Sequence, residues 1–76
     1  ACIFLSTTNE CTISNNILKN GGNGLYLVGA DDNVIMDNIA IEGNNIGIYL
    51  ASSDDNEIKG NNIQNNNANG IFLSST

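Results

Sequence analysis

Two pairs of adjacent carboxylates are the side chains of this sequence best suited to chemistry. Asp31 and Asp32 form one pair, and Asp54 and Asp55 form the other, 23 residues later. Carboxylates and turn carbonyls together bind Ca²⁺, so these four residues are a candidate calcium site. Their spacing matches neither the EF-hand loop nor the nonapeptide calcium repeat. A solvated acidic turn that keeps the chain soluble is therefore the alternative interpretation.

Catalysis is not expected from these carboxylates. Glycoside hydrolysis needs two carboxylates at a defined separation in a cleft, one of them with a raised pKa. The pairs here are neighbours in turn-forming sequence, and the chain has no histidine or arginine to complete a site. Lys19 and Lys59 are its only basic side chains, too few for the base and clamp of a lyase. We therefore expect that the chain is not an enzyme.

The soft metal ligands are equally sparse. Cys2, Cys11 and Met36 without any histidine are a poor set for copper. The two cysteines lie at different corners of the structural unit inferred below, whereas a disulfide needs Cα atoms within about 7 Å. Two free thiols are favoured over a Cys2–Cys11 disulfide, and no cofactor other than calcium is considered.

Composition excludes several classes of protein. The chain has 76 residues, enough for one small domain, and a formal net charge of −6. That charge removes the electrostatic basis for binding nucleic acid. No apolar run approaches the ~20 residues of a membrane span, so membrane insertion is not expected either. Sixteen asparagines and eleven isoleucines, with no proline or tryptophan, indicate an ordered, β-rich chain.

An internal repeat organises the sequence. The tetrad Gly-apolar-aromatic-Leu occurs at residues 24–27, 47–50 and 70–73, and residues 2–5 are a copy with Cys2 in place of glycine. Successive copies start 22, 23 and 23 residues apart. Further markers recur in register, namely Cys11, Asn33 and Asn56, then Ile13, Ile35 and Ile58, then Asn16, Asn38 and Asn61. The one-residue shortfall of the first copy must therefore lie between Asn16 and Gly24.

A parallel β-helix explains this period best. Helical repeats are disfavoured by the abundance of Asn, Gly and β-branched residues, and the fixed leucines of a leucine-rich repeat are absent. Apolar and other residues alternate with period two in short runs between turn residues, which indicates three short strands per coil. We predict an all-β, right-handed parallel β-helix of about three and a third coils. The coils span residues 2–23, 24–46, 47–69 and, in part, 70–76.

Residues 56–63, Asn-Glu-Ile-Lys-Gly-Asn-Asn-Ile, followed by residues 69–75, Asn-Gly-Ile-Phe-Leu-Ser-Ser, resemble the repeats of the NosD-like family. The resemblance covers essentially the whole chain. It implies a right-handed parallel β-helix and kinship with periplasmic, surface and carbohydrate-active solenoid proteins. The shared motif is scaffold, so function must be sought in the side chains that the scaffold carries.

Equivalent residues of successive coils should stack in columns. The predicted inward columns are Ile3/Leu25/Ile48/Ile71, Leu5/Leu27/Leu50/Leu73, Ile13/Ile35/Ile58 and Leu18/Ala40/Ile63. Ala40 either leaves the core underfilled or marks a local register change that turns its isoleucine neighbours inward. Cys11, Asn33 and Asn56 are expected to form an internal ladder of hydrogen bonds, in which the cysteine cannot act as an amide. The glycines that start the tetrads indicate either a positive φ or a close backbone approach.

All four aromatic residues occupy one repeat position between inward-facing aliphatics. Phe4, Tyr26, Tyr49 and Phe72 are therefore predicted to form an outward ladder. Self-stacking that stabilises the sheet is one interpretation. A platform for sugar rings and a lateral contact between protomers are the others.

The phase of the repeat suggests what the chain does. Residues 3–8 and 71–76 have nearly the same sequence, and neither resembles a polar cap, as expected for a slice of a longer solenoid. Unpaired strand edges would then favour end-to-end addition into a filament or a longer solenoid. We expect a structural, self-associating protein at the cell surface or outside the cell. A carbohydrate-binding or adhesion module, with polysaccharide as its partner, is the alternative.

Overall fold

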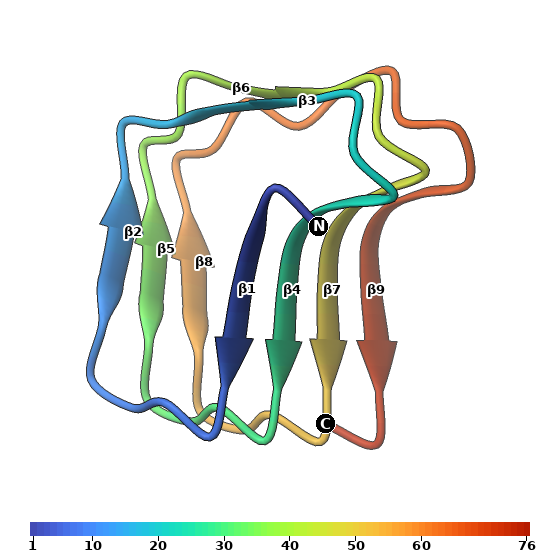
Figure 1. The fold of residues 1–76 in the computed structure, drawn as a ribbon. Coiled ribbons are helices and arrows are strands. Elements are labelled where there is room, and N and C mark those ends of the chain that lie inside the picture. Colours follow the sequence, from blue (N-terminus) through green and yellow to red (C-terminus); the bar gives the residue numbers. More distant parts are fainter.

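The computed structural model describes residues 1–76 as nine short strands that wind around one axis (Figure 1). The strands are β1 (Ile3–Ser6), β2 (Thr12–Ser14), β3 (Ile17–Lys19), β4 (Asn23–Val28), β5 (Val34–Met36), β6 (Ala40–Glu42), β7 (Ile46–Ala51), β8 (Glu57–Lys59) and β9 (Asn69–Ser74). There is no helix. Turn residues separate the strands, which keeps each of them to between three and six residues.

Three parallel sheets form the sides of the coil. We call them sheet A (β1-β4-β7-β9), sheet B (β2-β5-β8) and sheet C (β3-β6). Every pairing is parallel and joins residues 22 or 23 apart, such as Ile3 with Leu25 and Leu25 with Ile48. Because each coil adds one strand to each sheet, the chain is a β-solenoid of about three turns, as the repeat predicts.

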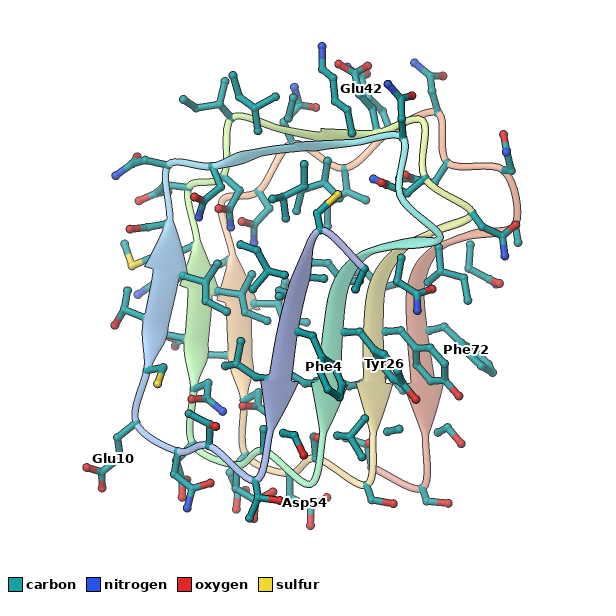
Figure 2. The ribbon with its side chains drawn as sticks, in the orientation of Figure 1. Phe4, Glu10, Tyr26, Glu42, Asp54 and Phe72 are labelled. Atoms are coloured by element: carbon teal, nitrogen blue, oxygen red, sulfur yellow. The ribbon has the colours of Figure 1, made fainter.

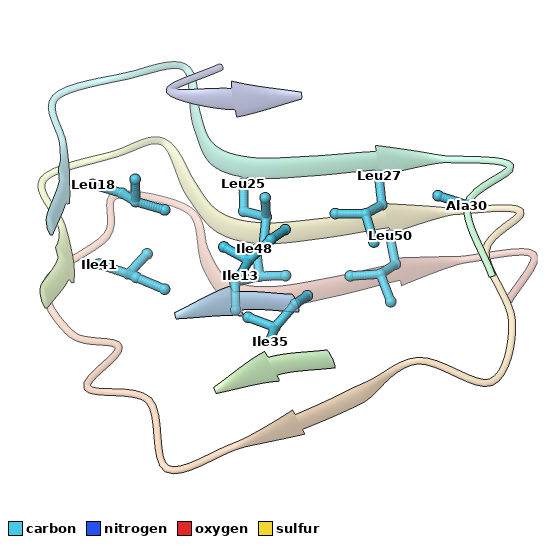
Figure 3. Close-up of a cluster of buried hydrophobic side chains, with 9 residues drawn as sticks. All are labelled: Ile13, Leu18, Leu25, Leu27, Ala30, Ile35, Ile41, Ile48 and Leu50. Atoms are coloured by element: carbon cyan, nitrogen blue, oxygen red, sulfur yellow. The ribbon is translucent and has the colours of Figure 1, made fainter. Parts of the chain in front are cut away.

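The core is a stack of aliphatic side chains between the three sheets (Figure 3). Sheet A contributes Leu25, Leu27, Ile48 and Leu50, and sheet B contributes Ile13 and Ile35. These residues lie at alternate strand positions, so their burial follows from the period-two pattern of the sequence. Three of the four predicted inward columns are those of the structure.

The fourth predicted column, Leu18/Ala40/Ile63, is wrong. Leu18 pairs with Ile41, and Ile41 bridges to Ile63, so Ile41 is the core residue. Ile41 is 0 % exposed, whereas Ile39 is 56 % exposed. The N–H groups of Ile39 and Ala40 both point to the carbonyl oxygen of Asn16, at 2.9 and 3.4 Å, as in a β-bulge. The second coil therefore accommodates its extra residue here, and only one of the two isoleucines turns inward.

Each corner of the coil is built from a residue in the left-handed region followed by an inward-facing residue. The left-handed residues stack in four columns: Thr7/Gly29/Ser52/Ser75, Glu10/Asp32/Asp55, Asn15/Asp37/Gly60 and Asn20/Gly43/Asn65. Asn, Asp and Gly adopt this conformation most readily, which explains why they punctuate the sequence.

The tetrad glycines serve a different purpose. Gly24 and Gly47 do not have a positive φ. A Cβ on Gly24 would lie 2.6 Å from the carbonyl oxygen of Gly47, and a Cβ on Gly47 would lie 2.5 Å from that of Gly70. Of the two explanations left open by the sequence, close approach of adjacent coils is therefore the one that applies.

Candidate functional site: open ladders, an aromatic column and an acidic edge

The predicted ladder residues Cys11, Asn33 and Asn56 lie one above another at the corner before sheet B. Oδ1 of Asn33 accepts the N–H of Cys11 at 2.9 Å, and Oδ1 of Asn56 accepts that of Asn33 at 2.8 Å. The Asn33 amide group donates back to the carbonyl of Thr8 at 2.9 Å. Each buried asparagine thus joins its own coil to the preceding one and satisfies turn groups that no strand can reach.

Two more asparagine ladders were not predicted. At the corner between sheets B and C, Oδ1 of Asn38 accepts the N–H of Asn16 at 3.1 Å, and Oδ1 of Asn61 accepts that of Asn38 at 3.0 Å. The spacing of Asn16, Asn38 and Asn61 was visible in the repeat and was a usable signal.

The third ladder lies between sheets C and A. Asn44 accepts the N–H of Gly21 at 2.8 Å, and Asn66 accepts that of Asn44 at 3.1 Å. Asn44 and Asn66 are only 22 residues apart, because the second and third coils place their extra residue on opposite sides of this ladder. That displacement hides the third ladder from a search at the 23-residue period.

The ladders are directional, and they leave the two ends of the solenoid unlike each other. Asn56, Asn61 and Asn66 close the last coil, and their own N–H groups have no acceptor. At the opposite end, the first coil carries Cys11 and Gly21 at two of the three ladder positions. The end formed by the last coil is therefore rich in unpaired donors, and the end formed by the first coil is poor in amides.

The last coil also exposes side chains that the core buries elsewhere. Leu73 pairs with Leu50 in one inward column, yet Leu73 is 55 % exposed and Leu50 only 2 %. Ile71 lies beside it in the same strand and is likewise exposed. We call this surface, formed by β8, Ile63 and β9, the C-terminal face. It combines an unpaired strand edge with uncovered core residues.

The four aromatic side chains lie in one column on the outer side of sheet A (Figure 2). Ring centroids are 5.3 Å apart for Phe4 and Tyr26, 4.8 Å for Tyr26 and Tyr49, and 4.9 Å for Tyr49 and Phe72. The two tyrosine rings are 22° from parallel and stacked. Each tyrosine therefore has a neighbouring ring on both faces, and only the two phenylalanines have one face free of another ring.

The acidic residues lie along the edge between sheets A and B, where Figure 2 shows Glu10 and Asp54. Asp31 uses its carboxylate within the turn, because Oδ1 accepts the N–H of Asp54 at 2.7 Å. Asp32 and Asp55 occupy the left-handed corner column, both with φ 58°. No three His, Cys, Asp or Glu side chains form a group that could hold a metal ion. The structure thus gives the four aspartates turn-forming positions and does not assemble them into a calcium site.

A protein built in this way is a β-solenoid repeat protein, with side-chain ladders that hold successive coils together. The chain belongs to the family described as periplasmic copper-binding protein (NosD), whose model matches residues 1–76. No curated protein and no solved structure matches it. The structure contains no helix that could span a membrane.

The copper named in that family description does not fit the residues of this chain. Both thiols are free. The Cys2 thiol lies near the carbonyl of Lys19 and Oδ1 of Asn44, and the Cys11 thiol lies near the carbonyl of Asn9 at another corner. Met36 is on β5, paired with Ser14. The three soft ligands are therefore spread over different parts of the coil, and oxygen atoms surround each thiol.

Proposed function

We propose that this chain is a structural segment of a periplasmic or surface solenoid, and that it self-associates end to end. The observation that carries the proposal is the C-terminal face. There the edge of β9, the unpaired N–H groups of three ladder asparagines and the exposed Ile71 and Leu73 all await the groups that a further coil supplies. An unpaired strand edge with a row of such groups is a template for another strand.

Catalysis, nucleic-acid binding and membrane insertion have no part in this function. We further propose a location outside the cytoplasm, at the cell surface or beyond it, and no bound cofactor. The uncharged outer side of sheet A and the acidic edge then serve the scaffold, the first through ring stacking and the second through turn formation.

Electron microscopy and light scattering at micromolar concentration test the self-association. Filaments with an axial repeat of about 4.8 Å are expected, because that is the spacing of strands within a sheet. Leu73→Glu places a charge on the C-terminal face and is expected to abolish assembly. Ser74→Glu, on the outer side of the same strand, is the control and should assemble. Monodisperse wild-type protein would contradict the proposal.

Carbohydrate binding is the second candidate, favoured by the aromatic column on a face whose strands carry no charged residue. Because the tyrosine faces are covered by neighbouring rings, a glycan would meet the ring edges and the hydroxyls of Tyr26 and Tyr49. Glycan binding that is lost in Tyr26→Ala with Tyr49→Ala would favour this candidate. Absence of binding on a glycan array would exclude it for the glycans tested.

A further inference from the structure

The two ends of the solenoid are out of step by one strand. Sheet A has four strands, whereas sheet B has three and sheet C has two strands and the bridge at Ile63. Figure 1 shows β9 lying one strand beyond the last strand of sheet B. A second copy that approaches the C-terminal face with its first coil brings one strand for each of the three sheets.

That difference prevents simple apposition of two copies. If β2 of the incoming copy pairs with β8, then the incoming β1 falls on the rung that β9 already occupies. If the incoming β1 pairs with β9 instead, sheets B and C each lack one rung at the joint. The gap would be about two strand spacings, roughly 9.6 Å, across which no backbone hydrogen bond forms.

We propose that end-to-end assembly proceeds by strand exchange, in which the incoming copy releases its own β1 and β9 of the receiving copy takes that place. This inference rests on the self-association proposed above. The incoming β4 then pairs with β9 in the register that already joins adjacent coils, Asn23 opposite Asn69 and Tyr26 opposite Phe72. The incoming β2 pairs with β8, so all three sheets are continuous.

The sequences of the strands support this partner. β4 reads Asn-Gly-Leu-Tyr-Leu-Val and β9 reads Asn-Gly-Ile-Phe-Leu-Ser, so every core and aromatic position of the joint is filled by a residue of the kind used between coils. The joint also continues the aromatic column, because Phe72 would stack on the incoming Tyr26 with the incoming Phe4 released.

β1 is the strand better suited to leave. It has four residues against six in β9, and Thr76 beyond β9 accepts the N–H of Ser53 at 3.2 Å. Cys2 stands in the column where adjacent coils leave no room for a Cβ, as Gly24 and Gly47 show. A strand enclosed between two coils needs glycine at this position, which β9 has in Gly70 and β1 lacks.

Disulfide locks distinguish the two strands, in a reference chain that carries Cys2→Ser and Cys11→Ser. Ser6 and Val28 are paired outer residues of β1 and β4, and Ala51 and Ser74 are the equivalent pair of β7 and β9. Ser6→Cys with Val28→Cys should lose assembly when oxidised and regain it on reduction. Ala51→Cys with Ser74→Cys should assemble in both states. The disulfides are verified by mass and thiol titration.

Each other result has a defined meaning. Assembly of both locked variants overturns strand exchange and leaves the self-association proposal standing. Loss of assembly in the β7–β9 variant overturns the assignment of β1 as the released strand. A reference chain and a wild-type chain that both stay monomeric refute self-association itself.

Hydrogen exchange of wild-type filaments provides a measurement that needs no disulfide. Amides of residues 3–6 should exchange at the rate of an unfolded chain, and those of residues 69–74 should be protected. Protection of both segments, or of residues 3–6 alone, would overturn the exchange.

Discussion

The contribution of the side-chain ladders can be measured at Asn44, the central residue of the ladder between sheets C and A. The change to test is Asn44→Ala. Asn44 is 0 % exposed, its Oδ1 accepts the N–H of Gly21, and its amide group donates to the buried carbonyl of Leu18 at 3.0 Å. Alanine removes both interactions and leaves the N–H of Gly21 and the carbonyl of Leu18 without partners.

The expected loss of stability follows from those two groups. A buried polar group left unpaired costs about 1–3 kcal/mol, and an ordinary hydrogen bond contributes about 1 kcal/mol. Leu18 is buried, whereas Gly21 belongs to the end coil that water reaches, so we expect Asn44→Ala to lose about 2–4 kcal/mol. A chain of this length has a total stability of roughly 4–11 kcal/mol, so the loss is a large part of it.

Urea unfolding followed by circular dichroism, at concentrations below any assembly, gives the free energy of unfolding. Asn45→Ala is the matched control, because Asn45 is adjacent and exposed, and its side chain makes no hydrogen bond. That control should change stability by less than about 0.5 kcal/mol. Equal stabilities for the two variants would refute the role assigned to the ladder.

Further predictions follow from the core, the coil spacing, the first ladder and the acidic edge. Ile41→Ala should lose about 2–5 kcal/mol in urea unfolding and Ile39→Ala almost nothing; the reverse order would restore the predicted register that the structure overturns. Gly47→Ala should lower stability by about 1–3 kcal/mol or more, because its Cβ has no space between coils; an unchanged midpoint would contradict this. Cys11→Asn should lower the critical concentration of assembly about fivefold, since an amide there completes a ladder across the joint and adds about 1 kcal/mol; sedimentation measures it, and an unchanged value would count against head-to-tail stacking. CaCl₂ and MgCl₂ at equal ionic strength should shift the melting temperature equally; a calcium-specific rise would reveal a site.

Position in the repeat made the fold predictable, and departures from the repeat limited that prediction. The tetrads and the isoleucine marker define sheets A and B, because every coil has the same length between them. The side around Ala40 could not be settled in the same way. The second coil places its extra residue before Ile41, and the third coil places its own after Asn66. Which residue bulges depends on packing against Leu18 above, a tertiary contact that a one-dimensional alignment does not contain.

The candidate site was less predictable, because its key groups are backbone atoms. The unpaired N–H groups of the C-terminal face belong to asparagines that look the same in sequence as those whose N–H groups are bonded. The acidic residues show the opposite problem, since their spacing suggested ligands while the structure uses Asp31 as a turn acceptor and Asp32 as a left-handed corner residue. Side-chain type was informative only where it was combined with the column in which the residue lies.

The residues that distinguish this solenoid from a uniform stack gather in its first coil. Cys2 replaces a tetrad glycine, and Cys11 and Gly21 stand where later coils have ladder asparagines. A ladder asparagine serves the coil before it, because its Oδ1 and its amide group both bond to that coil's backbone. The first coil therefore holds firmly to the second through Asn33 and Asn44 but offers little to a coil placed before it. A joint between copies formed at this coil is weaker than the contacts within one copy, and that difference makes assembly reversible and adjustable by single substitutions.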